Sequence, residues 1–156
     1  DLTEFYKKTL ASINDSPQRK KKIAILEYIN GVMTWLNTPI KFSKQTFSKI
    51  CPVSPEVTQH IIDTYSVKSA SGRLRPLSMR DKGFIHAIIL NLMICNFKID
   101  LELFTTASAS KVAVRKLNDL AKVVGTVSAR GEARIVMLKV PLPDAPSLIK
   151  RKRKAA

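Results

Sequence analysis

The chain has 156 residues, 45% of them apolar, and carries 27 lysines and arginines against 12 aspartates and glutamates, a formal net charge of +15. This length allows one ordinary domain or two very small ones. So large an excess of cations causes self-repulsion in the folded state and indicates an anionic partner, either nucleic acid or anionic lipid. Because the sequence begins with Asp1 and a polar, amphipathic stretch, we expect no signal peptide and a piece of a longer protein.

The first 36 residues predict two helices. Apolar residues recur near a 3.6-residue period over residues 1–16, which indicates a short amphipathic helix. Ser16 as an N-cap and Pro17 in the first helical position then predict a long helix over residues 17–36. Three lysines at 20–22 lie at its start, where the helix dipole disfavours cations, so burial of the apolar face that follows must outweigh this cost.

Two shorter helices and a polar turn follow. We expect an extended piece at residues 40–42, a short helix over 44–50 and a further helix over 54–65. The sequence Ser-Pro-Glu at the start of the last helix supplies an N-cap, a proline in the first position and an acid in the first turn. Residues 66–78 are polar and basic and contain Ser-Gly, so they predict a β-turn or a wing.

The most apolar stretch is GFIHAIILNLMICNFKI, at residues 83–99. Its apolar run is shorter than the roughly twenty residues that span a bilayer, and it contains His86, Asn91 and Asn96, which are costly in hydrocarbon. We therefore expect a buried helix over residues 80–96 and no membrane partner. The side chains expected to be buried are Phe84, Ile85, Ile88, Ile89, Leu92 and Cys95.

The same order of elements recurs after this helix. We expect a short extended piece at residues 98–99, a short helix over 100–106, and a longer helix that begins near residue 108 or 110 and ends at residue 124, before a glycine. Residues 126–140 alternate in polarity about a central turn and predict a β-hairpin.

Helix, short strand, helix, helix and wing thus occur twice, which fits two tandem winged-helix domains. The expected fold class is mainly α with small β-wings (α+β). The expected domains are an N-terminal linker helix at 1–16, a first winged helix at 17–78, a second at 79–143 and a basic C-terminal tail at 144–156.

Cations gather on the last long helix and on the hairpin that follows it. Four side chains form one stripe along the helix and two arginines lie on the hairpin; these six are Lys111, Arg115, Asn118, Lys122, Arg130 and Arg134. The stripe suits contacts to backbone phosphates, and a merely solvated helix face is the alternative that the sequence leaves open. No cluster of Asn or Gln with Arg demands base reading, so we expect weakly specific or shape-directed binding.

The corresponding helix of the first unit lacks cations and exposes polar and acidic side chains instead, at Glu56, Gln59, His60 and Asp63. Contact of the first unit with DNA would therefore use other cations. The candidates are Lys68, Arg73 and Arg75 on the wing, the lysines at 20–22, Lys44 and Lys49.

The C-terminal tail adds a dense cluster of cations, Lys150, Arg151, Lys152, Arg153 and Lys154. Three roles stay open for this cluster: a nuclear localisation signal, a flexible phosphate-binding arm and a solubilising terminus.

Motifs of catalysis and cofactor binding are missing from the sequence. It contains no GxGxxG, GxxxxGK(S/T), HExxH or GxSxG pattern, and its two histidines and two cysteines lack the spacing of a metal site. We expect no enzyme, no catalytic residue, no cofactor and no metal, with Cys51 and Cys95 as reduced thiols. Three functions stay open: a DNA-binding module, a protein-docking module of a multisubunit nuclear complex and, although no aromatic stacking platform is evident, an RNA-binding piece.

Three stretches carry a family likeness. They are RKKKIAILEYINGVMTWL at 19–36, MRDKGFIHAIILNLMICNFKIDLELF at 79–104, and RIVMLKVPLP at 134–143 with the basic tail behind it. Over about residues 17–154 the chain resembles the C-terminal tandem winged-helix region of the forty-nine-kilodalton-type subunit of RNA polymerase I, a family whose animal members are called PAF fifty-three.

The resemblance implies a stably associated, non-catalytic polymerase subunit that supports initiation and elongation on ribosomal DNA. Its implied partners are double-stranded DNA and other RNA polymerase I subunits, in the nucleus and nucleolus. It also implies DNA binding through winged helices, in an architecture similar to that of general transcription factor TFIIE. The positions carried over are Lys111, Arg115 and Lys122 on the recognition helix and Arg130 and Arg134 on its wing.

Overall fold

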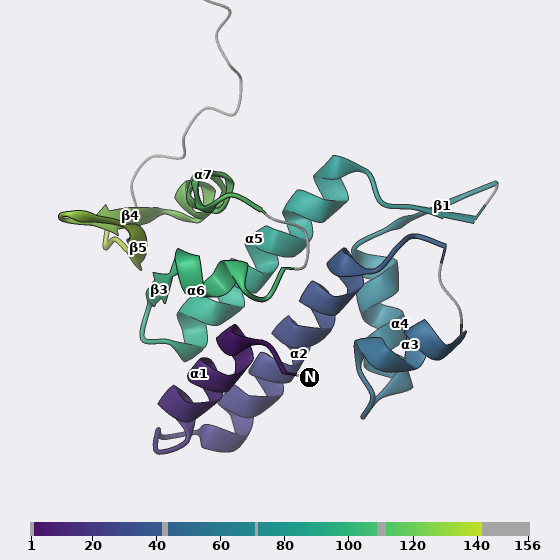
Figure 1. Ribbon diagram of the computed structural model, residues 1–156, viewed down its shortest axis with the longest axis horizontal. Helices are drawn as coiled ribbons and strands as arrows, with labels where there is room; N and C mark the ends of the chain where they lie inside the picture. The colour runs from purple at the N-terminus through teal and green to yellow at the C-terminus, as the bar shows by residue number, and fades with distance from the viewer. Residues whose placement is uncertain (1, 42–43, 71, 109–111, 142–156) are drawn as a thin grey trace, which may run out of the picture.

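Two long helices, α2 (Arg19–Asn37) and α5 (Leu77–Ile94), run side by side through the centre of the molecule (Figure 1). The computed structural model describes residues 2–41, 44–70, 72–108 and 112–141. Gly83 of α5 permits a close approach, because a Cβ atom there would lie 2.9 Å from Cδ1 of Leu36 in α2. Trp35 and Ile88 are fully buried, and burying a side chain of this size contributes about 2 kcal/mol.

Helix α1 (Glu4–Ile13) packs on α2 and on α6 (Leu101–Thr105), far along the chain. The N–H of Phe5 donates to Oγ1 of Thr106 at 2.9 Å, and the Phe5 ring meets the Phe104 ring edge to face with centroids 5.2 Å apart. The segment expected as a linker helix is therefore part of the core.

The first half of the chain continues with α3 (Lys44–Ile50), α4 (Pro55–Thr64) and a two-stranded hairpin of β1 (Val67–Ser69) and β2 (Gly72–Leu74). Ser54 caps α4 as predicted, because its Oγ accepts a hydrogen bond from the N–H of Val57 at 3.2 Å. The predicted short helix and capped helix are confirmed, and residues 66–78, expected as a β-turn or a wing, contain the two strands of this hairpin.

The second half adds β3 (Lys98–Asp100), α6, α7 (Val114–Val124), β4 (Thr126–Ala129) and β5 (Glu132–Leu138). The three strands form an antiparallel sheet in the order β3-β5-β4. Here the short predicted extended piece is a real strand, whereas residues 40 and 41 of the first half form a bend and residue 42 lies outside the described residues.

Two predicted helix starts are wrong. Helix α2 begins at Arg19 and not at Pro17, because Ser16 Oγ donates to the Pro17 carbonyl instead of capping and Gln18 has a left-handed backbone (φ 61°). Helix α7 begins four to six residues later than expected, because Ala113, the residue before it, is extended.

The ends of α5 also differ from the expectation. It begins at Leu77, since the Pro76 carbonyl accepts from the N–H groups of Met79 and Arg80, and it ends at Ile94. Asn96 and Phe97 then adopt left-handed backbones (φ 53° and 62°), a conformation that costs a non-glycine residue about 1–2 kcal/mol.

The expected burial along α5 is only partly confirmed. Phe84, Ile88 and Leu92 are buried, whereas Ile89 is 38% exposed. Ile85 and Cys95 are half-buried. The helix is apolar on several sides because it packs on α2, α7 and β3.

A single apolar cluster joins both halves of the chain, with buried side chains from α1, α2, α4, α5, α6, α7 and β5. Helices with two small antiparallel sheets confirm the α+β class. Cys51 and Cys95 are both free thiols. Within the described ranges, no helix combines the length and the apolar character that crossing a bilayer requires.

Candidate nucleic-acid interface

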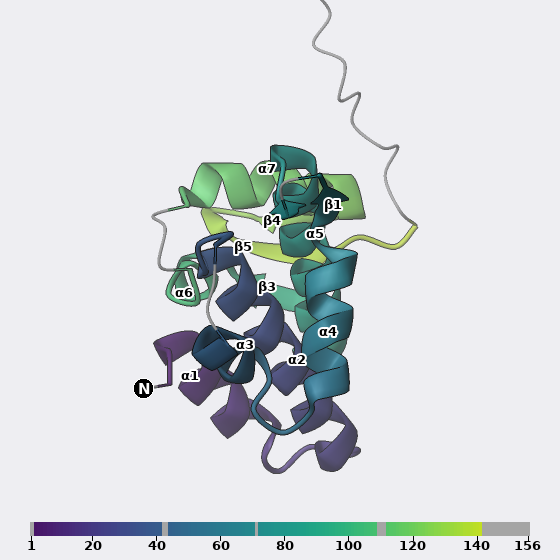
Figure 2. The same cartoon turned by 90° about the vertical axis from the view of Figure 1, so that its right-hand side faces the viewer.

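Helix α7 turns an apolar side to the core and a basic side outward. Leu117 and Leu120 are buried, whereas Arg115 and Lys122 are exposed. The two cations are seven residues apart, which is two helical turns, so they lie on the same face. Figure 2 shows α7 across the top of the molecule with β4 and β5 directly below it.

Gly125 directs the chain from α7 straight into β4. Its φ of 105° lies in the left-handed region that favours glycine, and its N–H donates to the Lys122 carbonyl at 3.1 Å. The β4–β5 hairpin therefore packs against α7.

A groove of about 410 Å³ lies between α7 and the hairpin. Its lining residues are Val114, Arg115, Asn118, Asp119, Lys122 and Ala133. Two predicted site cations, Arg115 and Lys122, thus meet at one groove, and Asp119 is the acid among the lining residues. An anionic backbone fits the cationic rim of this groove better than a neutral ligand does.

Asn118, which the sequence predicts as a contact to DNA, bonds the hairpin. Its Nδ2 donates to Ser128 Oγ at 3.3 Å and to the Ala133 carbonyl at 3.2 Å, so the side chain ties α7 to both strands of the hairpin. Its Oδ1 is buried without a hydrogen-bond partner among the described residues. Asn118 therefore positions the hairpin relative to the helix.

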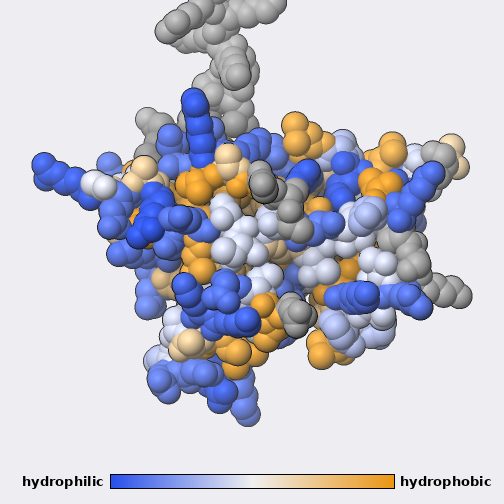
Figure 3. Space-filling model, viewed as in Figure 1, coloured by the Kyte–Doolittle hydropathy of each residue, from blue (hydrophilic) through white to orange (hydrophobic). Residues whose placement is uncertain are grey.

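The hairpin carries Arg130 beside its tip, where Gly131 turns the chain with φ 81°. Arg134 is also exposed, and its guanidinium lies 2.9 Å from Oε2 of Glu102. This hydrogen bond and the nearby carboxylates raise the pKa of Arg134. In Figure 3 hydrophilic side chains cover the end of the molecule that carries the hairpin, at the left.

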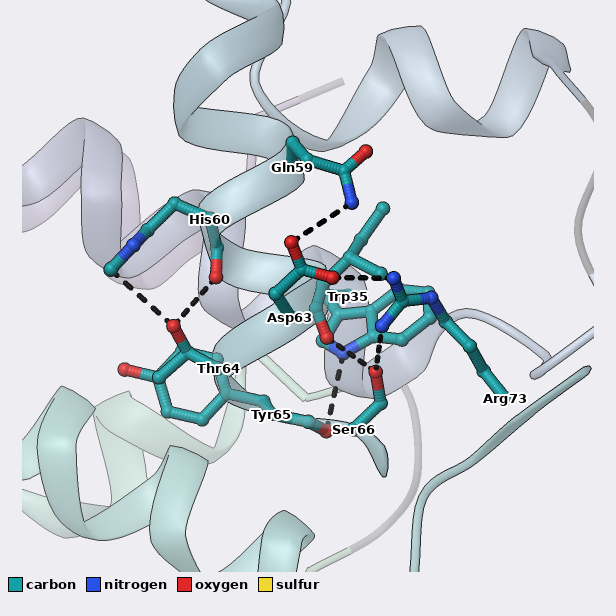
Figure 4. A network of polar contacts seen from close by, with 9 residues as sticks. Trp35, Gln59, His60, Asp63, Thr64, Tyr65, Ser66 and Arg73 are labelled. Atoms are coloured by element: carbon teal, nitrogen blue, oxygen red, sulfur yellow. Dashed lines mark hydrogen bonds and ion pairs between the residues drawn. The ribbon is translucent and has the colours of Figure 1, made fainter. Parts of the chain in front are cut away.

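The first hairpin presents its cations differently. Arg73 pairs with the Asp63 carboxylate and donates to Ser66 Oγ at 3.3 Å, as Figure 4 shows. Lys68 is exposed. Of these wing cations, Lys68 is therefore the one that projects into solvent.

Arg75 is turned toward the end of α2. Its guanidinium donates to the carbonyls of Trp35 and Thr38 and lies 4.9 Å from the centroid of the Trp35 ring. Burial and the charge of Arg80 lower the pKa of Arg75. Arg75 thus satisfies the C-terminal carbonyls of α2, and the sequence could not reveal this because the partners lie about forty residues earlier.

The exposed face of α4, a helix described over its whole length, is acidic and polar. Glu56, Gln59, His60 and Asp63 are exposed on it, as predicted. Hydrogen bonds from Gln59 and Arg73 lower the pKa of Asp63, so this carboxylate is ionised at neutral pH. A surface of this charge repels a phosphate backbone.

The structure adds one cation that the sequence did not single out. Lys139 is exposed just after β5, and its N–H donates to the Gly125 carbonyl at 3.4 Å, which places it beside the end of α7. Lys116 is exposed on α7 but pairs with Asp81 of α5 at 3.1 Å. Lys111, the tail cations Lys150 to Lys154 and the side chain of Lys44 lie outside the described part of the chain.

Metal-binding groups do not gather anywhere in the described ranges: no group of three or more His, Cys, Asp or Glu side chains could hold an ion there. The groove beside α7 instead carries the exposed cations Arg115 and Lys122, which can bind an anion.

Comparison with protein-family models matches residues 3–150 to one family, described as A49-like RNA polymerase I associated factor. Searches of curated proteins and of solved structures gave no significant match. The family is associated with RNA polymerase I. This association implies other subunits of the polymerase as partners and a location in the nucleus. Because the match spans nearly the whole chain, the resemblance noted in the sequence is confirmed, and the chain belongs to the A49-like RNA polymerase I associated factor family.

Proposed function

We propose that the chain is a non-catalytic DNA-binding module of an RNA polymerase I subunit, which supports initiation and elongation of rRNA gene transcription in the nucleolus. It contacts the duplex backbone through α7 and the β4–β5 hairpin, with the basic tail as a second contact. The observation that carries the proposal is the exposure of Arg115 and Lys122 at one groove beside α7, with Arg130 and Arg134 exposed on the hairpin that packs against this helix.

The order of elements supports a tandem winged-helix architecture for this module. Helices α2, α3 and α4 are followed by the β1–β2 hairpin, and α5, α6 and α7 are followed by the β4–β5 hairpin. We assign residues 17–78 to the first winged helix and 79–143 to the second, with α7 as the recognition helix of the second.

Contacts to phosphate explain the interface better than base reading does. Arg115, Lys122 and Arg130 are exposed and can follow a backbone, whereas the amide of Asn118 already bonds the hairpin. Phosphate contacts fix register and orientation but carry no sequence information. The proposal therefore includes little sequence specificity.

Fluorescence anisotropy with a labelled duplex, measured across salt concentrations, tests the proposal. Neutralising six phosphates gives a slope of log affinity against log salt of about −5. The double variant Arg115→Glu/Lys122→Glu should bind at least about tenfold more weakly and lose roughly 2 from that slope. Removing residues 150–156 from both proteins separates the tail from the fold.

The matched control is Lys7→Glu/Lys8→Glu, which makes the same charge change on two exposed residues of α1, a helix that lies away from α7 in both ribbon views. It should retain duplex affinity within about threefold. Equal losses in the two double variants, or no binding at low salt, would contradict the proposal. Single-stranded DNA and RNA competitors that outcompete the duplex would do the same.

A second candidate function is a protein-docking tandem winged helix within a multisubunit nuclear complex. The acidic, polar face of α4 favours it, because this face suits a protein surface better than a phosphate backbone. Under this alternative, Arg115→Glu/Lys122→Glu leaves duplex binding intact and weakens co-purification with the polymerase.

A further inference from the structure

Helices α2, α4 and α5 meet at a pocket that the proposed DNA contact does not use. It has a volume of about 180 Å³ and is lined by Tyr28, Tyr65, His86, Ile89 and Leu90. Its polar groups face one another: the Tyr65 hydroxyl lies 2.9 Å from His86 Nδ1 and 3.4 Å from the Tyr28 hydroxyl. With these groups satisfied, the pocket suits one aliphatic side chain.

Exposed apolar side chains continue from this pocket along α5. Ile89 is 38% exposed and Met93 is 52% exposed, and a spacing of four residues puts them on one face of the helix. Phe97, just past the end of α5, is 54% exposed and has a left-handed backbone that non-glycine residues rarely adopt. Exposed apolar side chains in a row on a strongly charged protein mark an interaction site.

The carboxylates of the three helices are engaged away from this face. Glu27 of α2 accepts from the Tyr6 hydroxyl of α1, and Asp81 of α5 pairs with Lys116 of α7. On α4, Asp63 pairs with Arg73 of the first hairpin, and Glu56 accepts from Ser54 at the helix start. These pairings leave the pocket without a neighbouring acid from α2, α4 or α5.

A cation stands at one end of the same face. Lys82 Nζ lies 6.0 Å from the centroid of the Tyr65 ring and donates to the Thr64 carbonyl at 3.2 Å, and burial together with the charge of Lys82 lowers the pKa of His86. An ammonium group has three N–H donors, so Lys82 can also bond a carboxylate of a partner. The face is thus apolar along α5 and positive at the end that carries Lys82.

We propose that this α2–α5 face, formed by Tyr28, His86, Ile89, Leu90 and Met93, docks an acidic amphipathic helix of a partner protein. One aliphatic side chain of the partner enters the pocket, and a carboxylate of the partner pairs with Lys82. Helix-in-groove recognition uses anchors at such spacings. A nucleic acid fits less well, because the exposed side chains at the pocket and one turn after it, Ile89 and Met93, are not aromatic and the Tyr65 ring is buried.

The probe for this proposal is a labelled synthetic helix of about sixteen residues, with leucines at i, i+4 and i+7 and glutamates on its polar face. A lysine-for-glutamate version of the peptide is the charge control. The double variant Ile89→Asp/Met93→Asp should weaken binding of the acidic peptide at least about tenfold. Leu77→Asp, an equally apolar exposed position at the other end of α5, should change it less than about twofold.

Duplex binding separates this proposal from the DNA-binding function, because Ile89→Asp/Met93→Asp should leave duplex affinity unchanged. In the unmodified protein, the peptide should shift the amide resonances of residues 86–93, a measurement that needs no variant to fold. Shifts confined to residues 114–124, equal binding of the lysine peptide, displacement by duplex DNA or no saturable binding would each overturn the proposal.

Discussion

The two hairpins of the molecule carry similar cations and use them in opposite ways. In β1–β2 and the segment after it, Arg73 bonds Asp63 and Ser66, and Arg75 bonds carbonyls of α2. In β4–β5, Arg130 and Arg134 are exposed. The arginines of the first hairpin and of the segment after it bond the rest of the fold, whereas the second hairpin exposes Arg130 and holds Arg134 in an exposed ion pair with Glu102.

The helices that precede the two hairpins, α4 and α7, also differ in surface charge. The outer face of α4 carries carboxylates and that of α7 carries cations, although both helices occupy the same place in the repeated order of elements. A repeated topology therefore does not imply a repeated function. The surface charge and its internal partners decide which copy can approach a phosphate backbone.

Substitution of Arg75 should have the largest effect on stability. Arg75→Met removes two charge-assisted hydrogen bonds to the C-terminal carbonyls of α2 and the contact with the Trp35 ring. We expect the free energy of unfolding to fall by about 2–4 kcal/mol, measured by urea denaturation. Duplex affinity at a temperature where the variant stays folded should be unchanged.

Arg130→Met is the matched control for this comparison. Arg130 is exposed near the hairpin tip, so its loss should change the free energy of unfolding by less than about 0.5 kcal/mol and should weaken duplex binding. Equal destabilisation by the two variants would show that the two hairpins do not differ in the way proposed.

The positions of the helices and hairpins in this comparison could be predicted from the sequence. Helix and hairpin positions followed from apolar spacing, from Ser54-Pro55 and from the glycine at the end of α7. The start of α7 could not be predicted from the sequence, and neither could the place of Arg115 in its first turn. The reason is that the backbone at Ala113 is set by tertiary packing and not by a local capping signal. The hydrogen bonds of Arg75 could not be predicted either, because their acceptors are main-chain carbonyls, which every residue has.

Substitution of Asn118 should have a smaller effect on duplex affinity. It tests how the hairpin is positioned without changing the charge of the interface. Asn118→Ala removes the hydrogen bonds from α7 to Ser128 and Ala133, so the hairpin is held less firmly beside the helix. Duplex affinity should fall about fivefold, roughly 1 kcal/mol, while the salt slope stays unchanged because no charge is lost. Unchanged duplex affinity would contradict the positioning role.

The smallest effect comes from two ion pairs, one made by an arginine of each hairpin. Arg134 pairs with Glu102 and Arg73 with Asp63, and each pair is expected to contribute less than about 1 kcal/mol to stability. Arg134→Gln should lower the salt slope of duplex binding by about 0.9, one phosphate contact, and Arg73→Gln should leave the slope as it is. Because Glu102 competes with phosphate for Arg134, Glu102→Gln should raise duplex affinity about twofold. If Arg73→Gln and Arg134→Gln lowered the slope equally, both hairpins would touch the backbone and the contrast between them would fail.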